Sequence, residues 1–121
     1  MVPGMVRLAV AAAVLIACNQ TDNDRPATLP YITQAILAPN CAQDVCHSSY
    51  TMVKGYAFDT VDNARRSLRM IVSKAEPEAS LLYTVLTRSV KRMPYDAPLP
   101  DKDIELILRW LQDNAVTDLG L

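Results

Sequence analysis

The chain has 121 residues, a hydrophobic fraction of 50% and a formal net charge of -1. This length suits one small domain with additional segments, and the hydrophobic content excludes a disordered chain. The near-neutral charge does not suit a nucleic-acid-binding protein, which would normally be clearly basic.

Residues 1–17 have the pattern of an export signal. Arg7 precedes an apolar run from Leu8 to Ala17. A stable membrane-spanning helix needs about 20 apolar residues, so this run is too short to be one. A positive charge, a short apolar run and a final small residue are typical of a cleaved signal peptide.

The end of this run, "LIAC" at Leu15 to Cys18, resembles the lipobox of bacterial lipoproteins. The resemblance implies that Cys18 is lipidated and becomes the mature N-terminus. Two or three acyl chains there would anchor the protein firmly to a membrane of the bacterial cell envelope, facing the periplasm. Cys41 and Cys46 then remain as a pair, which in an oxidising compartment is bonded to each other or to another group.

Residues 18–30 are predicted to form the lipidated cysteine and a flexible tether, because the segment from Asn19 is polar, has two prolines and lacks periodicity. The folded domain is predicted over residues 31–117. Its fold class is mostly α, with short helices and long loops. About 85 residues give a marginal core, so a large apolar cofactor would help to stabilise the domain.

The helices follow from apolar periodicity and from helix-start and helix-stop signals. The last helix has the clearest apolar stripe, with Trp110 on its flank. The segment 70–77 is predicted to be extended, and the proline-rich segment 92–100 to be a loop. Helices are predicted over 30–38 (ending at Pro39), 60–70, 77–88 and 101–115.

The segment "NCAQDVCHSSY" carries the candidate chemistry, since Cys46 directly precedes His47, the single histidine of the chain. Covalent haem attachment uses C-x-x-C-H, where two cysteines form thioethers and the histidine binds iron. Here Cys41 and Cys46 are five residues apart, or about 140° around a helix. The four residues between them must therefore loop outward for both sulfur atoms to reach one haem.

An electron-carrying haem iron commonly has a methionine sulfur as its second protein ligand. Met93 suits this role, because Pro94 disfavours helical geometry at the residue before it and an extended loop can point a side chain inward. Met52 and Met70 suit it less, since Met52 is close to His47 in sequence and Met70 ends an apolar helix face.

Two other interpretations of these residues stay open. In a haem-free domain, Cys41 and Cys46 would form a disulfide, and the protein would serve as a binding or structural module. Alternatively, thiolate and thioether ligands would bind copper(I), or the site would bind zinc. No catalytic role is predicted, because the chain has neither a Ser-His-Asp set nor a glycine-rich phosphate loop.

Taken in order, the motifs resemble the small cytochrome c-like domains of bacterial exported proteins and lipoproteins. The resemblance covers nearly the whole mature domain and implies a cytochrome c-like fold and electron transfer to a redox partner protein. It also implies haem c bound covalently by Cys41 and Cys46, with His47 and Met93 as axial ligands. The matching segments are "AILAPNC", "GYAFD" (55–59), "IVSKAEPEASLLY" (71–83), "RMP" (92–94) and "LILRWLQDNA" (106–115).

Overall fold

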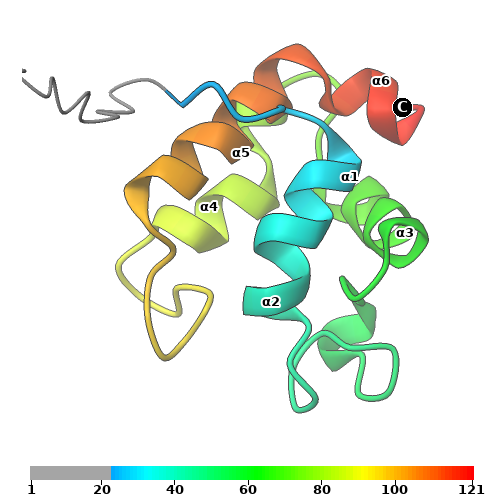
Figure 1. Cartoon of the computed structure of the whole chain (residues 1–121), viewed down its shortest axis with the longest axis vertical. Helices are drawn as coiled ribbons and strands as arrows, with labels where there is room; N and C mark the ends of the chain where they lie inside the picture. The colour runs from blue at the N-terminus through cyan, green and yellow to red at the C-terminus, as the bar shows by residue number, and fades with distance from the viewer. Residues whose placement is uncertain (1–22) are drawn as a thin grey trace, which may run out of the picture.

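Helices joined by loops make up residues 23–121, the part of the chain that the computed structural model describes (Figure 1). They are α1 (Leu29–Ile32), η1 (Thr33–Leu37), α2 (Ala38–Cys41), η2 (Val53–Gly55), α3 (Val61–Ile71), η3 (Pro77–Ala79), α4 (Leu81–Thr87), α5 (Asp101–Asp113) and α6 (Ala115–Leu119). These residues contain no strand, which confirms the mostly helical class. None of the described helices is long and apolar enough to cross a membrane. The predicted signal and Cys18 lie outside the described residues.

The first helix continues through α1, η1 and α2, so the prediction that it ends at Pro39 was wrong. A proline ring normally breaks a helix because it lacks an N–H group and crowds the carbonyl four residues earlier. Here the wider π-helical turn η1 precedes Pro39, and the Asn40 side chain donates to the Ile36 carbonyl at 2.8 Å. Cys41 therefore ends a helix rather than lying in a loop.

The helix predicted over 77–88 is divided at Ser80, which has an extended backbone between η3 and α4. Ser80 is buried, and its hydroxyl accepts the Ser73 N–H at 2.8 Å. The segment predicted to be extended before it is partly helical, since α3 continues to Ile71.

The core gathers around α5, which packs against α1, α4 and α6. Trp110, predicted on the flank of the apolar stripe, is fully buried together with Leu106. The Trp110 ring N–H donates to Asp118 Oδ2 at 2.8 Å, and the same oxygen accepts the Leu29 N–H at 3.0 Å. One carboxylate oxygen thus joins α5, the start of α1 and α6.

The folded part extends beyond the predicted boundary at residue 117. Helix α6 buries Leu119, which is 1% exposed. The Arg65 and Arg69 side chains on α3 donate to the carbonyls of Asp118 and Leu119, at 3.3 and 2.9 Å. These two arginines connect α3 to the C-terminal helix.

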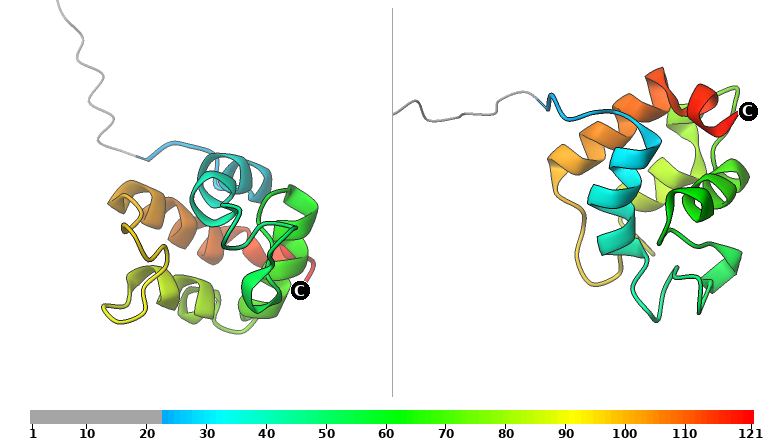
Figure 2. Two further views of the ribbon diagram at one scale, coloured as in Figure 1. Left: turned by 90° about the horizontal axis from the view of Figure 1, so that it is seen from below. Right: turned by 45° about the vertical axis from the view of Figure 1, so that its right-hand side comes forward.

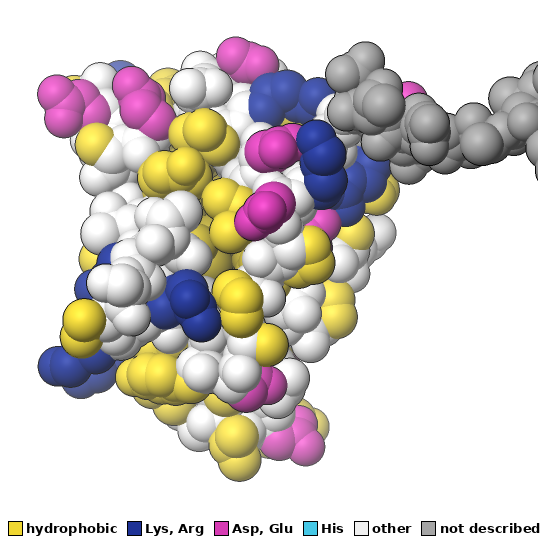
Figure 3. Space-filling view, turned by 90° about the vertical axis from the view of Figure 1, so that its left-hand side faces the viewer, with side chains coloured by type: hydrophobic (Ala, Val, Ile, Leu, Met, Phe, Trp, Pro, Cys, Tyr) yellow, Lys and Arg dark blue, Asp and Glu magenta, His cyan; other side chains and the backbone are white. Residues whose placement is uncertain are grey.

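The folded part also begins before residue 31, because side chains of α5 hold residues that the sequence assigns to the tether. Arg109 donates to the carbonyls of Asn23 and Arg25. Arg25 pairs with Asp103 at 2.7 Å. Figure 3 shows acidic and basic side chains gathered where the described chain begins. The first described residues are therefore fixed to the domain.

The two longest loops lie at the same end of the molecule. One joins α2 to α3 and contains η2, and the other joins α4 to α5. Figures 1 and 2 show both loops at the end opposite α6. This arrangement brings the cysteine–histidine segment toward the loop that carries Met93.

Candidate functional site

A cavity of about 450 Å³ lies between the two loops. It is lined by all four residues that the sequence predicts as cofactor or metal ligands: Cys41, Cys46, His47 and Met93. Its other lining residues are Asn40, Gln43, Val45, Val53, Lys54, Pro94, Tyr95 and Asp96.

The chain between the two cysteines forms a closed loop. The Cys46 N–H donates to the Gln43 carbonyl at 2.8 Å, and the His47 N–H donates to the Cys41 carbonyl at 3.0 Å. Between them, Gln43 and Asp44 are exposed and Val45 is 78% exposed, whereas Ala42 is partly buried against the hydrophobic core. This turn returns Cys46 to the cavity that Cys41 lines. Both cysteines are free thiols.

Cys41 differs electrostatically from an ordinary thiol. The residue as a whole is partly buried, and it packs against the hydrophobic core. This burial, with a smaller contribution from the charge of a nearby Cys46 thiolate, raises the pKa of the Cys41 thiol to about 12. Cys41 is therefore a neutral thiol at physiological pH.

Alkylation should reveal this protection of Cys41. At about pH 8, iodoacetamide should modify Cys41 on the order of a thousandfold more slowly in the native protein than in urea, where the pKa returns to about 8.5. Mass spectrometry of the Cys41 peptide measures the rate. Equal rates in the two states would contradict the assigned environment.

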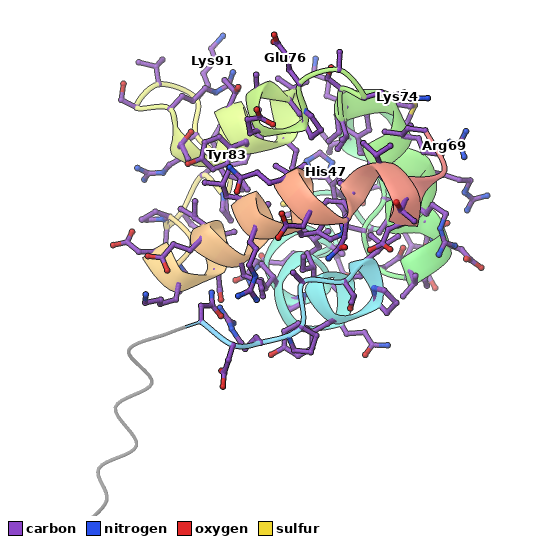
Figure 4. All side chains as sticks on the ribbon, turned by 90° about the horizontal axis from the view of Figure 1, so that it is seen from above. His47, Arg69, Lys74, Glu76, Tyr83 and Lys91 are labelled. Carbon is purple, nitrogen blue, oxygen red and sulfur yellow. The ribbon has the colours of Figure 1, made fainter. Side chains whose placement is uncertain are left out.

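The His47 ring is held on three sides. Its Nδ1 atom lies 2.9 Å from the Val53 carbonyl oxygen, which can only accept a hydrogen bond, so Nδ1 carries the proton. The ring packs against Phe58 with centroids 5.5 Å apart, and against Tyr56 at 6.0 Å. In the view of Figure 4, His47 projects near the middle of the molecule, whereas Lys74 and Lys91 project at the periphery. Nε2 is therefore the nitrogen left to bind a ligand.

Met93 enters the cavity from the loop between α4 and α5. Its N–H donates to the Val85 carbonyl of α4 at 2.8 Å, which fixes the backbone at this position. Met52 and Met70 line a separate groove beside α3. Of these three methionines, only Met93 shares a cavity with His47.

The sequence does not reveal the Val53 carbonyl as a partner of His47, because backbone groups carry no residue signature. The sequence does contain one indication of an unusual backbone here, the glycine at position 55. Gly55 has a φ of +82° and closes the turn after Val53. A glycine this close to a candidate ligand indicates a special backbone conformation.

Within residues 23–121, no three His, Cys, Asp or Glu side chains come together as a metal-binding group. The candidate set therefore consists of two separate thiols, one imidazole and one thioether around a cavity. Comparisons with protein-family models, with curated proteins and with solved structures find no match to the chain.

Proposed function

We propose that the protein is a lipid-anchored c-type cytochrome domain that transfers single electrons. Haem would be held covalently by Cys41 and Cys46, with His47 and Met93 as axial ligands. The observation that carries this proposal is the single cavity that these four side chains line, although Met93 comes from a loop distant in the sequence.

The size of the cavity and the thiol groups that line it both suit haem. Its volume of about 450 Å³ lies within the usual range for cofactor sites. A thioether forms when a cysteine S–H group adds across a vinyl group of haem, so the thiol hydrogen passes to carbon and no oxidant is consumed. Two free thiols meet this requirement. Bound haem would supply one-electron redox chemistry, and methionine ligation favours a high potential.

The protein's own contribution is to orient the ligands. The Val53 carbonyl fixes His47 with Nε2 unprotonated, which is the form that binds a metal. The Val85 carbonyl fixes the backbone at Met93. Tyr95, which is 75% exposed, also lines the cavity.

The proposal includes an anchor at Cys18 in the bacterial envelope and a redox partner protein on the periplasmic side. Only five peptide bonds separate Cys18 from Asn23, where the described chain begins. An extended chain spans at most about 3.6 Å per residue, so the domain would lie within roughly 18 Å of its lipid. Incorporation of labelled fatty acid, and its loss in Cys18→Ser, tests the anchor.

A haem-free module with a Cys41–Cys46 disulfide is the second candidate. The hydrogen bond from the His47 N–H to the Cys41 carbonyl favours it, because this bond closes the loop between the cysteines. Both candidates use the same pair of thiols, so one experiment separates them.

The deciding experiment is the pyridine haemochrome spectrum of the full chain, produced in cells that contain the haem-maturation machinery. Haem bands of the two-thioether type, with haem remaining on the chain after denaturation, are expected. Cys41→Ser and Cys46→Ser should each leave at most one thioether and shift the bands. A colourless, folded protein without free thiols at Cys41 and Cys46 would reject the cytochrome and favour the disulfide module.

A further inference from the structure

The turn between Met52 and Gly55 has an unusual backbone. Met52, Lys54 and Gly55 have φ values of +44°, +59° and +82°. This left-handed region is uncommon for residues with a side chain, because the Cβ atom approaches the backbone. Two such residues, Met52 and Lys54, store strain here, and strain of this kind persists only where the surrounding structure holds it. Gly55 adopts the same region without this penalty, because it has no Cβ atom.

Hydrogen bonds hold the strained turn at both ends. The Met52 N–H donates to the carbonyl of the buried Ser48 at 2.9 Å. The Val53 N–H donates to the Cys46 carbonyl at 3.1 Å, and the Gly55 N–H donates to the Met52 carbonyl at 2.7 Å. The Val53 peptide is thereby fixed against the cysteine–histidine segment.

The turn directs the Val53 carbonyl toward His47. Its oxygen accepts a hydrogen bond from His47 Nδ1 at 2.9 Å. Free imidazole in water favours the other tautomer, with the proton on Nε2. We infer that the strained turn at Met52 to Gly55 is a positioning device that selects the His47 tautomer with Nε2 unprotonated. The identity of the ligand at Nε2 rests on the proposed function, whereas the tautomer does not.

Gly55 allows a clean test, because a Cβ atom added there meets no other atom within 4 Å. A substitution at Gly55 therefore acts through backbone conformation alone. Asparagine tolerates the left-handed region better than alanine does. If the turn selects the tautomer, the share of the Nδ1–H form of His47 should be highest with Gly55, lower in Gly55→Asn and lowest in Gly55→Ala.

Gly120→Ala provides the matched control. Gly120 also has a left-handed backbone, with φ of +65°, and a Cβ atom there would make only an ordinary contact of 3.6 Å with Arg69. It follows α6, and the loop between α2 and α3, which carries His47, lies at the opposite end of the molecule (Figure 1). Its substitution carries a similar conformational cost without touching the turn.

The measurement is the ¹⁵N chemical shifts of the His47 ring in the haem-free full chain at about pH 8.5. The Nδ1–H form should dominate in the unaltered chain. Its ratio to the Nε2–H form should fall roughly threefold in Gly55→Asn and roughly tenfold in Gly55→Ala, and stay unchanged in Gly120→Ala.

Three results would overturn the inference: an unaltered chain in which Nε2–H dominates, Gly55 variants with the unaltered ratio, or an equal fall in Gly120→Ala. If Gly55→Ala does not fold, Gly55→Asn alone decides by the same criterion. Pyridine haemochrome spectra of the same chains address the proposed function separately. A haem-free protein with dominant Nδ1–H would reject the cytochrome and retain the positioning turn.

Discussion

Replacing Asp118 with alanine should lower the free energy of unfolding by about 3 kcal/mol, since two buried donors would each lose their acceptor at a cost of roughly 1–3 kcal/mol. Asp118 Oδ2 accepts the Trp110 ring N–H and the Leu29 N–H. The residue at the start of α1, Thr28, makes no side-chain cap, so Asp118 serves that purpose from the other end of the chain. A negative charge there also suits the positive end of the first helix. Urea unfolding of the full chain measures the change.

Asp113→Ala is the matched control, because it removes the same charge from an exposed position at the end of α5. It should alter the stability by no more than about 0.5 kcal/mol. Asp118→Asn keeps one side-chain oxygen and should lose less than Asp118→Ala. If Asp118→Ala were as mild as Asp113→Ala, the carboxylate would not join the three helices as described.

The importance of Asp118 could not be read from the sequence, which placed the domain boundary at residue 117. Helix α6 has five residues and is too short to show apolar periodicity. Its stability comes from contacts distant in sequence, such as those of Arg65 and Arg69 with its carbonyls. By contrast, α5 starts at Asp101 as predicted, because thirteen residues display a full apolar stripe.

At the first helix, a local sequence signal was misleading, because the helix was predicted to end at Pro39 and continues beyond it. Pro39 is a strong local stop signal, and only the tertiary structure shows that a wide turn and the Asn40 side chain accommodate it. The error matters for the site, because the continued helix determines where Cys41 lies. Cys46 and His47 follow it in a loop. The spacing alone indicated that the two cysteines would not lie on one face of a helix.

The candidate ligands were predictable as residue types, since cysteine, histidine and methionine have distinctive chemistry and few copies here. Their partners were not. The Val53 carbonyl on His47 and the Val85 carbonyl on the Met93 N–H are backbone groups, positioned by how the loops fold. Hydrophobic patterning predicts helices, but it does not predict which carbonyl faces a given side chain.

Met93→Ala should abolish the weak absorbance band in the red that reports a sulfur–iron bond, and should lower the reduction potential. Methionine is the ligand that raises the potential of such a site, and alanine cannot replace it. The thioether content should stay unchanged, because Cys41 and Cys46 remain. Visible spectra and redox titration of the haem-loaded full chain measure these effects, and the pyridine haemochrome spectrum measures haem content.

Met70→Ala is the control for Met93→Ala. Met70 is 62% exposed and lines the separate groove beside α3, so its loss should leave the band and the potential unchanged. Met93→His should restore a strong second ligand without restoring the band, which separates loss of ligation from damage to the loop. A band that survives in Met93→Ala but disappears in Met70→Ala or Met52→Ala would move the second ligand to the groove beside α3. The cavity between the loops would then supply His47 alone.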